Sequence, residues 1–168
     1  MKKLSIVAAT LAIAGFASSA ANAAGPGGTA SGTFNVTVNL TPICQIASTT
    51  TFGASDALSN ISLNYASFDP DTFGQTTFNV RCAAGLSYSV KLDAETVTTL
   101  GLTYTLGLAA GTTPAYTGGL TAVADTGATA GKAYIVGVKI AGGQGGDCGS
   151  GSNAACTNTT GRTVTVTY

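Results

Sequence analysis

Apolar residues recur at every second position in the best-patterned segments of this 168-residue chain. In an extended chain this period places all the apolar side chains on one face, which is typical of a β-strand with one buried face. The clearest runs lie at 78–82, 88–92, 102–108, 134–140 and 164–168, and residues 58–65 follow the pattern loosely. Gly, Pro, Asp and Asn separate the runs, and residues 120–129 are expected to form a loop. The pattern predicts an all-β sandwich of six or seven strands.

Residues 1–23 have the features of a secretory signal peptide. Lys2 and Lys3 precede an uncharged apolar run at 4–16, and Ala21-Asn22-Ala23 fits a signal-peptidase site. The apolar run is too short to span a bilayer as a stable helix. We therefore expect 1–23 to be removed on export from a bacterium, which leaves 145 residues, the size of one domain.

Four cysteines, Cys44, Cys82, Cys148 and Cys156, are expected to form two disulfides in an oxidising compartment. Four cysteines allow three pairings. The simplest has Cys148 and Cys156 closing their own Gly-rich loop, which leaves Cys44 with Cys82. On this interpretation residues 142–149 belong to a long hairpin loop. A zinc site is disfavoured because the chain has no CxxC motif and no histidine.

The charged residues argue against a nucleic-acid partner and against an enzyme. Only 8% of residues are charged, and removal of Lys2 and Lys3 leaves five basic and seven acidic groups, a net charge of about −2. Without histidine, the Ser-His-Asp and Cys-His arrangements are excluded. Asp69-Pro70-Asp71 is best explained as a turn. No catalytic residue, metal ligand or cofactor is predicted.

The segment GTFNVTVNLTPIC, residues 32–44, allows two interpretations. Its alternation predicts a strand with Phe34, Val36, Val38 and Leu40 on one face. That strand could be the first of its own sandwich, or it could pair with the exposed sheet edge of another molecule. Three features favour the second interpretation: the flexible Gly-rich spacer at 24–31, the scarcity of charge, and a final apolar run that continues to Tyr168.

The order of these motifs resembles the archaic, Csu-type chaperone–usher pilins of the spore coat protein U-like family. GTFNVTVNLTPIC is similar to the N-terminal donor segment of these pilins, and LNYASFDPDTFGQTTFNVRCAAGLSYSVKLDA is similar to their central block. The closing TVTVTY is similar to their last strand. Residues 100–130 match poorly, the second cysteine pair is outside the common pattern, and 160–163 replace the family's usual lead into the last strand.

The resemblance implies an incomplete immunoglobulin-like sandwich at 43–168, preceded at 24–42 by a flexible leader and a donor strand. Subunits of this kind polymerise by donor-strand exchange into adhesive, biofilm-forming surface fimbriae of Gram-negative bacteria. Phe34, Val36, Val38 and Leu40 would be the donor side chains, and Cys44–Cys82 would be the family disulfide. Val164, Val166 and Tyr168 would line the acceptor groove, with the Tyr168 carboxylate as the chaperone's anchor.

The expected partners are identical subunits, a periplasmic chaperone and an outer-membrane usher, with a tip adhesin as a further candidate. Two alternatives remain from the residues themselves. One is a self-contained secreted β-sandwich that acts as a binding module, against which the lack of Trp counts. The other is a spore or cell-coat component. A secreted hydrolase is disfavoured because no acid–base pair is evident.

Overall fold

The computed structural model describes residues 32–52, 58–149 and 154–168. The chain divides into two units, Met1–Asn39 and Leu40–Tyr168, and the second contains every strand found among these residues. The eight strands are β1 (Cys44–Ala47), β2 (Thr72–Cys82), β3 (Ser87–Leu92), β4 (Thr96–Thr99), β5 (Leu102–Ala110), β6 (Val123–Thr126), β7 (Lys132–Ile140) and β8 (Val164–Thr167). The described part of the chain contains no helix, and so none that could cross a membrane. The all-β prediction is confirmed.

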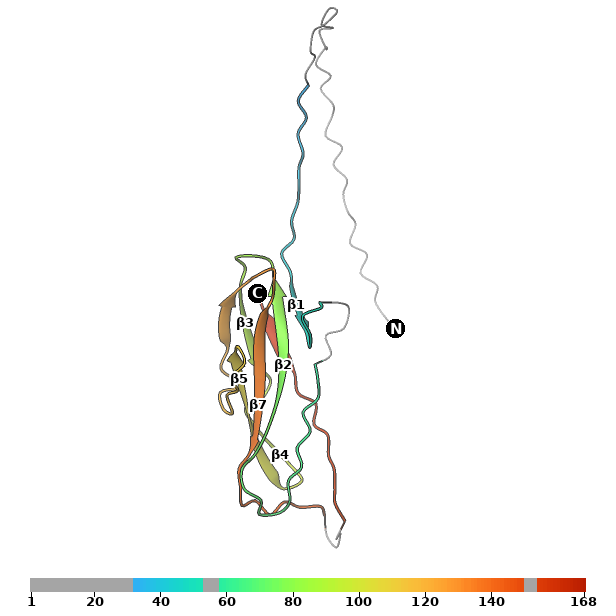
Figure 1. The fold of residues 1–168 in the computed structure, drawn as a ribbon, viewed down its shortest axis with the longest axis vertical. Coiled ribbons are helices and arrows are strands. Elements are labelled where there is room, and N and C mark those ends of the chain that lie inside the picture. Colours follow the sequence, from blue (N-terminus) through green and yellow to red (C-terminus); the bar gives the residue numbers. More distant parts are fainter. Residues whose placement is uncertain (1–31, 53–57, 150–153) are drawn as a thin grey trace, which may run out of the picture. The chain divides into compact units, whose positions relative to one another are not determined.

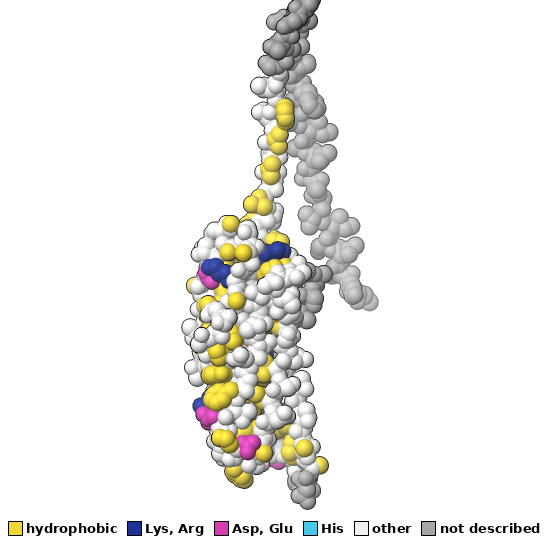
Figure 2. Space-filling view, viewed as in Figure 1, with side chains coloured by type: hydrophobic (Ala, Val, Ile, Leu, Met, Phe, Trp, Pro, Cys, Tyr) yellow, Lys and Arg dark blue, Asp and Glu magenta, His cyan; other side chains and the backbone are white. Residues whose placement is uncertain are grey.

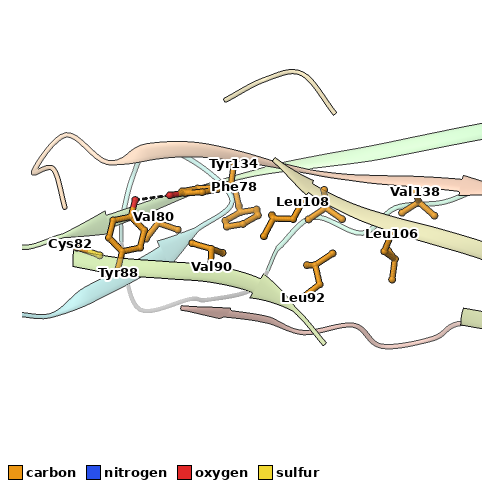
Figure 3. Packing of buried hydrophobic residues seen from close by; sticks show 11 residues of the cluster. Phe78, Val80, Cys82, Tyr88, Val90, Leu92, Leu106, Leu108, Tyr134 and Val138 are labelled. Carbon is orange, nitrogen blue, oxygen red and sulfur yellow. Dashed lines mark hydrogen bonds between the residues drawn. The ribbon is translucent and has the colours of Figure 1, made fainter. Parts of the chain in front are cut away.

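The strands form two antiparallel sheets (Figure 1). The larger sheet has the order β1-β2-β7-β5-β4 and the smaller has the order β6-β3-β8. Side chains from β2, β5 and β7 meet those of β3 in one hydrophobic core between the sheets (Figure 3). Phe78, Val90 and Tyr134 are completely buried there. The core is built from the alternating runs, because in each strand every second side chain points inward.

The Leu40–Tyr168 unit has two opposite ends with different residues. Cys44 pairs with Cys82, and Ser87, five residues beyond Cys82, begins β3 near the end of β8. We call this end the disulfide pole. The other end holds the start of β2, the end of β7 and the β4–β5 turn, with Gln144 hydrogen-bonded among them. We call it the Gln144 pole.

A loop at 111–119 crosses the outer face of the larger sheet. It lies over Gly107 and Gly137, which are partners in the register of β5 and β7. A Cβ atom added at Gly137 would lie 2.2 Å from the Ala115 carbonyl oxygen, and one added at Gly107 would lie 2.4 Å from the same atom. Glycine is therefore required at both positions for the loop to approach the sheet so closely.

The structure corrects several expectations. Residues 120–129 contain β6, whose sequence is too polar to predict a strand but which pairs with β3. Residues 58–65, expected to follow the strand pattern, form none of the assigned strands. Residues 142–149 are not a hairpin loop, because they lie on the connection from β7 in one sheet to β8 in the other. The expected signal peptide and spacer lie outside the described residues.

We expect the Gly137→Ala substitution to destabilise the fold by about 1–3 kcal/mol, because the loop at Ala115 must move to admit the methyl group. Urea unfolding of the purified protein measures the change. Gly161→Ala is the matched control, since an added Cβ there meets nothing within 4 Å, and we expect a change within about 0.5 kcal/mol. Equal stability of the two variants would contradict the close approach.

Candidate functional site

In the part of the chain that the structure describes, strand β8 pairs with one strand only, β3. Asp93 donates its backbone N–H to the Thr163 carbonyl at 3.1 Å. Opposing residues of an antiparallel pair alternate between hydrogen-bonded and non-hydrogen-bonded positions. In the register of β3 with β8, the backbone N–H and C=O groups of Val164 and Val166 therefore point to the outer edge. Among the described residues no strand pairs with that edge.

Strand β1 forms a second free edge by the same alternation. Ala83 donates its N–H to the Ile43 carbonyl at 3.1 Å, so the backbone groups of Cys44 and Ile46 point away from β2. The Cα atoms of Cys44 and Cys82 are 4.1 Å apart, as expected for a non-hydrogen-bonded pair. The disulfide thereby fixes the start of β1 to the end of β2.

Both free edges lie on the same side of the body. Strand β6 contacts β5, so the β6 edge of the smaller sheet lies towards the β4–β5 edge of the larger one. The β8 edge consequently lies towards β1. Below β1, the segment at 58–65 runs beside β2, and an added Cβ at Gly74 would meet Ile61 and Leu63 (Figure 1). We call this the open side.

The open side carries a row of half-buried apolar side chains. They pack against the core from both sheets and from the segment between β1 and β2, and they are Ile46, Leu58, Ile61, Leu63, Val164 and Val166. Free backbone groups thus border apolar side chains that are only partly covered. This combination favours the addition of another strand.

A hydrogen-bond network holds β3, and with it β8, at the disulfide pole. The hydroxyl groups of Tyr88 and Tyr134 lie 2.8 Å apart (Figure 3). Tyr134 also donates to Asp125 Oδ2 at 3.0 Å. Burial and these two partners raise the pKa of Tyr134 well above its usual value. The hydrogen bond from Lys132 holds the pKa of Asp125 below its usual value, against the opposing effect of burial. The network joins both sheets.

The segment with the expected donor residues contains no assigned strand at 32–43. Its four apolar side chains are all strongly exposed: Phe34 at 85%, Val36 at 72%, Val38 at 82% and Leu40 at 82%. Figure 2 shows hydrophobic groups spaced along this segment. In monomeric soluble proteins such a contiguous set of exposed apolar side chains is uncommon and marks an interaction site.

An apolar hollow of about 340 Å³ opens at the disulfide pole. Its lining includes Leu40, Ile43, Arg81, Ala83 and Thr129. Arg81 lies over the Phe52 ring, 4.4 Å from its centroid, and donates to Gln45. None of the ion pairs found among the described residues includes Arg81.

The structure contains both expected disulfides, Cys44–Cys82 and Cys148–Cys156. Val164 and Val166 lie together on β8, and Tyr168 follows the strand with 61% of its surface exposed. The backbone groups of Cys44 and Ile46 were missed as part of the site, since CQIA has no clear alternation. The described residues hold no group of three or more Cys, Asp or Glu side chains suited to a metal ion.

No protein-family model, curated protein or solved structure matches this chain. Its function is therefore inferred from the geometry of the open side and from the sequence motifs.

We expect the tyrosine–aspartate network to make the fold acid-labile. A carboxyl group with a depressed pKa contributes stability that is present above the unfolded pKa, about 4, and is lost as the pH falls through the folded value. The urea midpoint should therefore drop between pH 6 and pH 3. In Asp125→Asn, and in Lys132→Met, which removes the main cause of the shift, the drop should be smaller. An unchanged drop in both variants would contradict this assignment.

Proposed function

We propose that this protein is a structural subunit of a secreted surface fibre, assembled when the segment at 34–40 of one subunit completes the open side of the next. The observation that carries the proposal is the free outer edge of β8, where unpaired backbone groups flank the half-buried Val164 and Val166. The exposed alternating segment at 34–40 is the matching strand. On this proposal the body is an incomplete immunoglobulin-like sandwich.

The partner strand comes from a second molecule, because the residues between Leu40 and Cys44 are too few to place a subunit's own segment at 34–40 antiparallel to its own β8. Every strand pair among the described residues is antiparallel, and an antiparallel partner of β8 would place Leu40 towards the Gln144 pole and Phe34 at the disulfide pole. Seven residues of strand span about 20 Å. The four steps from Leu40 to Cys44, which is held at the disulfide pole, cover at most about 14 Å. A subunit cannot complete its own β8 in this direction.

The energetics favour the insertion. Burial of four apolar side chains contributes roughly 1.5–3 kcal/mol each before ordering costs are subtracted. Ladder hydrogen bonds to Val164 and Val166 each add about 1 kcal/mol net. The low charge of the chain adds little electrostatic repulsion to oppose the approach of two subunits. Because one subunit donates and the next accepts, the contact is heterologous and generates an open filament.

The resemblance to archaic chaperone–usher pilins supports the same assembly and supplies its expected partners. These are a periplasmic chaperone that protects the open side before assembly and an outer-membrane usher that exchanges it for the next subunit. The proposed product is a fimbrium on the surface of a Gram-negative bacterium that supports adhesion and biofilm formation. A subunit whose apolar edge is left unprotected would aggregate, and this explains why a chaperone is needed before assembly.

Fibres sheared from expressing cells test the proposal on a denaturing gel without reductant. We expect a ladder of multiples that collapses to one band of about 14 kDa on boiling, because strand exchange is non-covalent but kinetically trapped. Removal of residues 24–40 should abolish the ladder and leave an exported monomer bound to the chaperone. Wild-type fibre yield from this truncation, or a monomer band before boiling of wild type, would overturn the proposal.

A charge on the inward face of the donor segment should block assembly. We expect Val36→Asp to abolish the ladder, because an unpaired carboxylate buried on the open side costs several kcal/mol. Thr37→Asp is the matched control, since Thr37 lies on the opposite face of the segment and its side chain would remain in solvent. The two variants should be compared by ladder yield at equal export. Normal assembly of Val36→Asp would show that the donor register is different.

A further inference from the structure

We propose that successive subunits also touch through their poles, with Phe68 of the accepting subunit seated in the hollow at the disulfide pole of the donating subunit. This inference rests on the proposed function, because strand addition is what brings the two poles together. It assigns a second contact between copies of this chain, separate from the inserted strand.

The direction of the inserted strand determines which poles meet. An antiparallel partner of β8 has Leu40 towards the Gln144 pole of the accepting subunit. The donating subunit's own disulfide pole begins at Cys44, at most about 14 Å along the chain from Leu40. The disulfide pole of one subunit therefore lies beside the Gln144 pole of the next.

Phe68 is an exposed aromatic residue that the Gln144 pole holds in an unusual conformation. Its side chain is 75% exposed, and its φ of 69° lies in the left-handed region, which bulky residues rarely adopt. The turn is fixed by the loop at 143–145: Phe68 donates its N–H to the Gln144 carbonyl at 2.8 Å, and Gly143 donates to the Asp69 carbonyl at 2.9 Å. An exposed residue that hydrogen bonds hold in a strained conformation is a candidate for contact with a partner molecule.

The hollow at the disulfide pole suits an aromatic side chain. Its volume of about 340 Å³ is at the small end of the range for ligand pockets. Ile43, 53% exposed, and Ala83 give it apolar walls. Leu40 and Thr41 also line the hollow, and on the proposed function Leu40 leaves this lining when it enters the next subunit, so that Ile43, Ala83 and Arg81 remain as walls.

The charges of the two poles are complementary. At the disulfide pole, Arg81 forms no ion pair with a carboxylate of the described residues. At the Gln144 pole, Asp69 and Asp147 form no ion pair with a Lys or Arg side chain of the described residues. Charged side chains are few on the face seen in Figure 2. With so few charges in the chain, opposite unpaired charges at the two poles favour this head-to-tail orientation over the reverse.

Cysteine cross-linking of assembled fibres tests the contact. The chain with Phe68→Cys and Thr129→Cys places one thiol at each pole, while all four native cysteines are already in disulfides. A disulfide needs Cα atoms within about 4.4–6.8 Å. We expect mild oxidation to give a ladder that survives boiling and collapses only with reductant. The control pairs Thr129→Cys with Thr77→Cys, an exposed position in the middle of β2.

The outcomes separate this inference from the proposed function. A boil-resistant ladder from the Phe68 pair, with the Thr77 pair collapsing on boiling, supports the polar contact. If wild type forms a heat-labile ladder but neither pair cross-links, or both cross-link equally, this inference alone is overturned. If wild type forms no ladder, the proposed function fails and the polar contact fails with it.

Discussion

The one-sided pairing of β8 with β3 is the constraint on which the rest of this structure depends. Because β8 pairs only with β3 among the described residues, the backbone groups of Val164 and Val166 remain on an open edge while their half-buried side chains pack against the core. An edge of this kind is either protected or paired in a stable protein. On the proposed function, the exposed segment at 34–40 of another subunit pairs with this edge.

A disulfide and a hydrogen-bond network hold the strands that border this edge in place. The disulfide between Cys44 and Cys82 fixes the base of the leader to the end of β2. The hydrogen bonds from Tyr134 to Tyr88 and Asp125 tie β3 to the larger sheet at the same pole. The strands that border the open side are therefore tied to β2 and β7 of the larger sheet. On the proposed function, the conformational-entropy cost of strand addition falls mainly on the leader, which has no strand partner among the described residues.

Much of the fold could be predicted from the sequence, and the failures have a physical cause. The runs that became β2, β3, β5 and β7 were visible because each buries one full face, and burial requires an apolar side chain at every second position. Strands β4 and β6 were not visible, because TVTT at Thr96–Thr99 is mostly polar and VADT at Val123–Thr126 lacks a clear apolar alternation. These segments pair with β5 and β3 respectively. The clear alternation at 34–40 has no partner strand among the described residues.

The sequence by itself indicated the all-β class, the simplest disulfide pairing and an alternating apolar segment at 34–40. These are properties of local pattern and composition, which the chain carries in any conformation. Only the tertiary structure decided that β8 ends a sheet, that β1 lies on the same side, and that Phe68 and the hollow at Arg81 occupy opposite poles. These positions depend on which strands pair across long sequence separations, and the local sequence pattern does not indicate that pairing.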